Sequence, residues 1–289
     1  MNRRDLLRLT AYASSLVLAG RLPLLSAGRQ KSRPRRQQQP ARQTSAAKRN
    51  IFTEPPAIEP VTGYLGKFRP VATGTMRGDF AVKYDLIRWG PVNNKTGRAR
   101  NIVSGSLEIV RKVNGRDTVY ETVEHRTGQT TSRVTTKLNC RGKLDAVVRW
   151  TAVSDVMNGR NAQTDLKFEE HGIVSNGNIV RNNKLGTIES VNSHTLLPQE
   201  ALLSLLAGDI VKSDDLHFDM LQNGLVIKPN QTLYYSGQIQ IPVAGRTATM
   251  DCYAQTGYGI LPTHYLADEH GRVQLITQQN TNWALKELS

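Results

Sequence analysis

Apolar and polar side chains alternate with a period of two along most of the chain after residue 64, which is typical of β-strands with one face on a core. The clearest runs are 144–152, 231–243 and 247–254. One-sided alternation over many strands favours an antiparallel sheet. We therefore expect a mainly β fold with these apolar sets facing the core: Leu144, Ala146, Val148, Trp150 and Ala152; Leu233, Tyr235, Gly237, Ile239, Ile241 and Val243; and Ala248, Met250, Cys252 and Ala254.

The opposite faces of the same runs carry mostly polar side chains. Asp145, Val147, Arg149 and Thr151 alternate with the first set, and Thr247, Thr249 and Asp251 alternate with the last. Asn-Gly pairs tolerate the positive φ that a type I′ turn needs. The expected hairpin turns are Asn114-Gly115, Asn176-Gly177, Asn223-Gly224 and, between the last two runs, Ala244-Gly245.

One segment departs from the alternation. Pro198–Ala207 has the spacing of a helix, with Pro198 in its first turn and Gly208 just past its end. Its leucines make a wide apolar stripe, extended by Leu196 and Leu197, so we expect heavy burial. The expected fold is therefore a single curved antiparallel sheet, a β-sandwich-like layer or half-barrel, packed around one apolar helix at about 197–207.

The N-terminus has the composition of a targeting segment. Asn2-Arg3-Arg4-Asp5-Leu6-Leu7-Arg8 precedes the apolar run 9–19, which is shorter than the about 20 residues that cross a bilayer but suits a signal-peptide core. The seven-residue segment 2–8 resembles the twin-arginine export signal, with Asn2 in place of the usual Ser or Thr. The resemblance implies that Arg3 and Arg4 are read by the twin-arginine export machinery, that 1–27 is the signal segment, and that the protein is periplasmic or exported.

The strong positive charge of the chain belongs mainly to this end. Of the formal net charge of +14, residues 1–50 carry +11, with twelve Lys or Arg and one acid, Asp5. Residues 28–50 alone contain eight basic residues, no acid and few large apolar side chains. Such a stretch cannot bury enough apolar surface to offset its ordering entropy. We expect 28–63 to be a disordered linker and lead-in, either a plain spacer or a segment that binds an anionic envelope polymer.

Residues 64–289 show no break in composition and are predicted to form one domain. Their layout resembles the half-barrels of periplasmic carriers of the lipoprotein-carrier type. The closing stretch 265–273, followed by Trp283, is also similar to the last hairpin of periplasmic half-barrel families of unknown function. The resemblance implies a possible small apolar ligand under the curved sheet.

The residue types that carry chemistry are few. Asp215, His217 and Asp219 would project from one face of a strand and are weak candidates for a metal site, although an apolar opposite face makes an ordinary solvent-facing strand the simpler interpretation. Cys140 and Cys252 are candidates for a disulfide if the protein is exported. No motif of a known catalytic class is present. We assign no catalytic residue and no cofactor.

Three functions fit these observations. The first is an exported cell-envelope protein with a structural or binding role. The second is a coat-like protein whose arm at 28–50 neutralises packaged nucleic acid. The third is a hydrolase without a readable motif, since acid–base pairs can be assembled from distant strands.

Overall fold

The computed structural model describes residues 58–92, 99–128, 130–158, 166–208, 210–257, 261–278 and 281–289. Thr53–Ser289 form one compact unit. The predicted signal segment 1–27, with Arg3 and Arg4, and the basic stretch 28–50 lie outside the described residues.

The described residues are mostly strand. Fifteen strands form a single sheet, with a 3-10 helix η2 (Glu59–Val61) and two short α-helices, α2 (Ala201–Ala207) and α3 (Ile210–Ser213). The strands are β1 (Phe80–Val92), β2 (Ala99–Asn114), β3 (Asp117–Arg126), β4 (Thr130–Arg141), β5 (Ala146–Asn158), β6 (Leu166–Ser175), β7 (Asn178–Asn183), β8 (Gly186–Val191), β9 (Leu196–Pro198), β10 (Leu216–Gln222), β11 (Val226–Val243), β12 (Arg246–Thr256), β13 (Thr263–Ala267), β14 (Val273–Thr277) and β15 (Thr281–Leu288).

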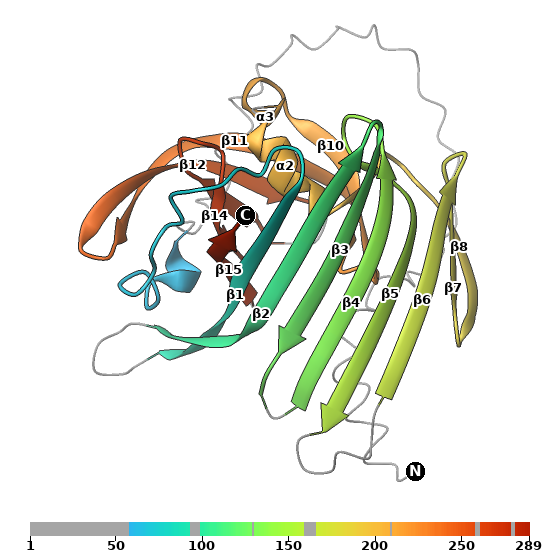
Figure 1. Cartoon of the computed structure of the whole chain (residues 1–289), viewed down its shortest axis with the longest axis horizontal. Coiled ribbons are helices and arrows are strands. Elements are labelled where there is room, and N and C mark those ends of the chain that lie inside the picture. Colours follow the sequence, from blue (N-terminus) through green and yellow to red (C-terminus); the bar gives the residue numbers. More distant parts are fainter. Residues whose placement is uncertain are drawn as a thin grey trace, which may run out of the picture. The chain divides into compact units, whose positions relative to one another are not determined.

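The sheet consists of two meanders joined where the chain's last strand returns to its first. The strand order is β8 to β1, then β15 to β9, and every pair is antiparallel except β9–β10. The sheet curves so that α2 lies between its two halves (Figure 1). The mainly β fold class and the single curved sheet around an apolar helix are therefore confirmed, and all four predicted turns join neighbouring antiparallel strands.

The sheet is covered on both faces near its middle. The inner cluster packs around α2 and includes Tyr120, Trp150, Tyr265 and Trp283. The outer cluster lies on the opposite face, because Ala284 belongs to it while its neighbours Trp283 and Leu285 belong to the inner cluster. The outer cluster consists of Val61, Leu65, Phe68, Ile87, Ile241, Val243, Met250, Cys252, Leu266, Leu275 and Ala284.

The segment before β1 supplies the cover of this outer face. Val61, Leu65 and Phe68 pack into the outer cluster. Val61 has no exposed surface although it belongs to the stretch 28–63 that we expected to be linker, so part of that stretch packs on the domain. The cover also explains why β13 and β14 are buried at every position.

Asp251, expected on a polar face, is buried on the opposite, inner side, because its neighbours Met250 and Cys252 face the outer cluster. There it accepts the hydroxyl of Tyr235, and Lys212 lies 2.8 Å away.

Bulges change two of the predicted strand faces. In β5 the register shifts opposite Asn139 and Cys140, which pairs Cys140 with Val147. Val147 is therefore buried in the inner cluster, whereas the alternation had placed Val148 there. In β11 the register shifts between Tyr235 and Gly237. The predicted single face of 231–243 is thus divided, with Leu233 and Tyr235 against the inner cluster and Ile239, Ile241 and Val243 against the outer one.

Helix α2 is shorter than predicted and begins later. Leu196–Pro198 form β9, which pairs in parallel with β10, and the helix starts at Ala201. Pro198 has no backbone N–H to donate, and it is tolerated there because β9 is an edge strand whose free side needs no donor. Every residue of α2 except Ser204 is buried, and Gly208 is the C-cap, as expected.

The turn between β10 and β11 reaches across the inner side of the sheet to the other meander. The indole nitrogen of Trp150 on β5 donates a hydrogen bond of 2.8 Å to the carbonyl of Gly224 in this turn. Gly172 lies opposite Trp150 on β6, and a Cβ at Gly172 would meet the indole ring at 2.1 Å. The Trp150 ring can therefore occupy this position only because Gly172 has no side chain.

Candidate functional site

The side chains proposed for a metal do not come together. His217 is exposed, with Nδ1 3.0 Å from the hydroxyl of Thr232. Asp219 falls in an irregularity of the β10–β11 pairing and is buried. It accepts backbone N–H groups from Ser193, His194 and Asn230, at 2.9, 3.2 and 2.9 Å. Asp215 precedes β10. Asp219 thus fixes loops, and no group of three or more metal-binding side chains occurs among the residues that the structure describes.

The two cysteines are separate buried thiols. Cys140 belongs to the inner cluster and Cys252 to the outer one, and both are free. Burial raises the pKa of the Cys140 thiol, and the carboxylates of Asp145 and Glu200 add to the rise. A protonated thiol is a poor nucleophile, so we expect the Cys140 thiol to be unreactive in the folded protein.

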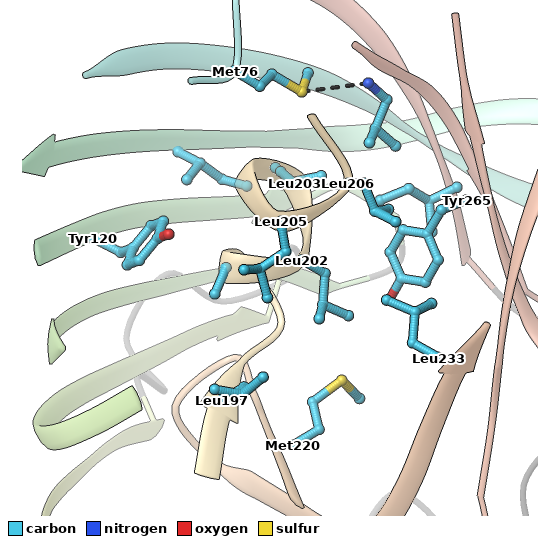
Figure 2. Close-up of a cluster of buried hydrophobic side chains, with 14 of the residues drawn as sticks. Met76, Tyr120, Leu197, Leu202, Leu203, Leu205, Leu206, Met220, Leu233 and Tyr265 are labelled. Carbon is cyan, nitrogen blue, oxygen red and sulfur yellow. Dashed lines mark hydrogen bonds between the residues drawn. The ribbon is translucent and has the colours of Figure 1, made fainter. Parts of the chain in front are cut away.

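The interior around α2 is filled by side chains. Leu202, Leu203 and Leu206 have no exposed surface, and Leu205 is 3% exposed. Figure 2 shows these leucines between residues from both halves of the sheet. The neighbours labelled there are Met76, Tyr120, Leu197, Met220, Leu233 and Tyr265. The helix itself therefore occupies the place where the carrier resemblance would put an apolar ligand.

The N-terminal end of α2 holds an unusual buried acid, which the sequence did not single out. Glu200 is 2% exposed, and its Oε2 has no hydrogen-bond partner among the described residues. Burial, with a smaller contribution from the nearby carboxylate of Glu124, raises the pKa of Glu200 to about 7. Near neutral pH this group therefore carries a proton in much of the population.

Two other buried carboxylates on the inner side have cationic partners. Asp145 lies 2.7 Å from an Arg111 nitrogen and also accepts the hydroxyls of Thr118 and Tyr120. Glu170 accepts two hydrogen bonds of 2.8 Å from Arg181. The contrast marks Glu200 as a buried acid for which no cationic partner is seen among the described residues. A buried neutral acid could exchange a proton, but its burial leaves no room for a substrate beside it.

A polar pocket of about 640 Å³ opens at the other end of α2. Arg77 lies in it and donates a hydrogen bond of 2.6 Å to the carbonyl of Ala207 at the helix end. Arg272 is held by Asp268 at 2.7 Å. Both arginine side chains thus have a partner within the protein. Its lining is Ala72, Thr73, Gly74, Thr75, Arg77, Ala207, Glu269, His270, Gly271 and Arg272.

Exposed apolar side chains gather on the three-stranded end of the sheet, which the sequence pattern did not single out. This end, β6–β8, extends past the strand β5 that the β10–β11 turn contacts. Its large exposed apolar residues are Leu166, Ile173, Leu185, Ile188 and Val191. All six residues of β8 are exposed. This region is the accessible surface best suited to contacts with another macromolecule.

Comparisons with known proteins add a likeness of fold only. No protein-family model matches the chain, and no curated protein is similar to it in sequence. Among solved structures, it is similar to the crystal structure of a beta-barrel-like protein of the domain of unknown function DUF1849 from Brucella abortus. The identity is 10%, the TM-score is 0.47, and the likeness covers 75% of this chain and 99% of that one. A similarity at this level says nothing of function.

None of the helices in the described part of the chain is long and apolar enough to span a bilayer.

Proposed function

We propose that this chain is an exported protein of the cell envelope whose β domain has a structural or binding role exercised at its outer surface. The observation that carries the second half of the proposal is the filled interior, in which Leu202, Leu203 and Leu206 have no exposed surface. A carrier needs a lined cavity for its ligand, and here side chains of the protein take that position. The acid at Glu200 is too enclosed to act on a substrate, which favours a binding role over hydrolysis.

Export is supported by Arg3, Arg4 and the apolar run that follows them. Replacing both arginines by lysine should retain the protein in the cytoplasm with its signal segment uncleaved, because the twin-arginine machinery reads the pair and not only its charge. Cell fractionation with N-terminal sequencing measures this. Arg33→Lys with Arg35→Lys, the same change within the basic linker, is the matched control and should be exported normally.

Wild-type levels of the Arg3→Lys, Arg4→Lys variant in the periplasm would show that the export interpretation is wrong. A wild-type protein that keeps Met1 and purifies with nucleic acid would favour the coat-like alternative instead.

The filled interior predicts a large stability loss on truncation. Leu206→Ala should lower the free energy of unfolding by about 2–5 kcal/mol, through lost transfer energy and the cavity left behind. Leu166→Ala, at a leucine on β6 that is 56% exposed, should change it by less than about 0.5 kcal/mol. Denaturant unfolding measures both. Mass spectrometry of organic extracts should find no stoichiometric apolar molecule; such a molecule, together with a mild loss for Leu206→Ala, would establish a carrier.

A further inference from the structure

The two edges of the sheet are protected very differently. Edge strand β9 has three residues, all buried, and ends in Pro198, so it offers little backbone for pairing. Edge strand β8 has six residues, all exposed, with no proline and no lysine. No described strand pairs with its free side. An edge of this kind is a template for another strand.

The existing ladder determines which backbone groups of β8 point outward. Asn192 donates its N–H to the carbonyl of Gly177 on the β7 side at 2.8 Å, and β8 pairs with β7 in continuous antiparallel register. Because hydrogen-bonded and non-hydrogen-bonded pairs alternate in such a ladder, Ser190, Ile188 and Gly186 also direct their groups toward β7. The N–H and C=O groups of Thr187, Glu189 and Val191 are therefore left facing the open edge.

We propose that β8 pairs with β8 of a second copy of this chain, antiparallel about a twofold axis at Ile188. This register joins outward-facing backbone groups and gives each exposed apolar side chain of the edge an apolar partner. It places Ile188 opposite Ile188 of the other copy, Thr187 opposite Glu189, and Val191 next to Leu185. A shift by one residue on each strand places the two Glu189 carboxylates opposite each other, which is repulsive.

The self-complementarity favours a second copy over a foreign peptide. All three exposed apolar residues of the β8 edge, which are 89%, 49% and 77% exposed at Leu185, Ile188 and Val191, receive an apolar partner in the twofold pair. An isologous contact of this sort closes on itself, so a dimer is expected rather than a fibre. A six-residue strand makes a modest interface, and we expect a dissociation constant of roughly micromolar order. The inference rests on the proposed surface binding role and is independent of export.

Cysteine cross-linking of the full chain tests the register directly. The native Cys140 and Cys252 are buried. At a non-hydrogen-bonded pair the two Cα atoms are about 4.5 Å apart, within the range of a disulfide. Ile188→Cys should therefore form a covalent dimer on mild oxidation. Glu189→Cys, one residue along the same strand, and Ile173→Cys, an exposed position away from the edge, should remain largely monomeric on a non-reducing gel.

Sedimentation across a concentration series gives a second measure without cross-links. The wild-type protein should show a monomer–dimer equilibrium, and Ile188→Lys should raise its dissociation constant at least tenfold because two like charges would meet at the axis. Ile173→Lys should leave the dissociation constant unchanged. A monomer at every concentration would overturn the proposal. So would a dimer that Ile188→Lys does not weaken, equal cross-linking at all three positions, or β8 occupied by a different protein in cells while purified chains stay apart.

Discussion

Gly172→Ala is expected to lower the free energy of unfolding by about 3–5 kcal/mol, the cost of losing a packed aromatic ring. The new methyl group would lie 2.1 Å from the Trp150 indole, so the ring must leave its position. Its hydrogen bond to the Gly224 carbonyl is then lost as well. This hydrogen bond joins the β10–β11 turn to β5 beside the inner cluster, so its loss should also loosen the packing around α2.

Denaturant unfolding followed by tryptophan fluorescence measures the effect. Gly66→Ala is the matched control, because a Cβ there meets nothing within 4 Å, and it should change stability by less than about 0.5 kcal/mol. Trp150→Leu should remove the clash with the methyl group, so the Gly172→Ala, Trp150→Leu double variant should lose less than the sum of the two single losses. A loss under about 1 kcal/mol for Gly172→Ala would show that the ring does not depend on this glycine.

Glu200→Gln is expected to stabilise the protein at alkaline pH and to remove much of its pH dependence. The pKa of Glu200 is raised to about 7 by burial, above its ordinary value in the unfolded chain. The folded state therefore binds the proton more tightly, and stability is lost as the pH rises through about 7. The difference from the ordinary value of 4.5 corresponds to about 3 kcal/mol.

The measurement is the free energy of unfolding between pH 5 and pH 9. The wild-type protein should lose up to about 3 kcal/mol across this range through Glu200, whereas Glu200→Gln should show a flatter profile. Glu287→Gln, at an exposed acid on β15, should keep the wild-type profile. Parallel profiles for wild type and Glu200→Gln would mean that Glu200 is not the group that titrates.

The alternation predicted strands well because it depends only on neighbouring residues. It assigned faces correctly where a strand is regular and failed at bulges, as at Val147 and in the second half of β11. A bulge is an outcome of pairing with another strand, and nothing in a single strand's pattern requires it. The prediction also assumed one covered face, so it missed that Val61 and its neighbours bury the outer face over β13 and β14.

The site residues were harder to predict for the same reason. The spacing singled out Asp215, His217 and Asp219 on the assumption of a regular strand. The pairing of β10 with β11 is irregular at Asp219, and the Asp219 side chain is buried instead of lying beside His217 on the exposed face. Glu200 was missed because an acid at a helix start is ordinarily solvated. The available signal was its position between two pairs of leucines, 196–197 and 202–203, which predicts burial on both sides.

The sequence by itself determined the class of the fold, the hairpin turns, the burial of the helix and the export prediction, because each of these depends on local patterning or on a short motif. Only the tertiary structure decided which strands form the edges, which acid is left unpaired, and that α2 fills the space beneath the sheet. Those features arise from contacts between segments far apart in the chain, such as Trp150 with Gly224, and the energy of such contacts is not encoded in the pattern of either segment alone.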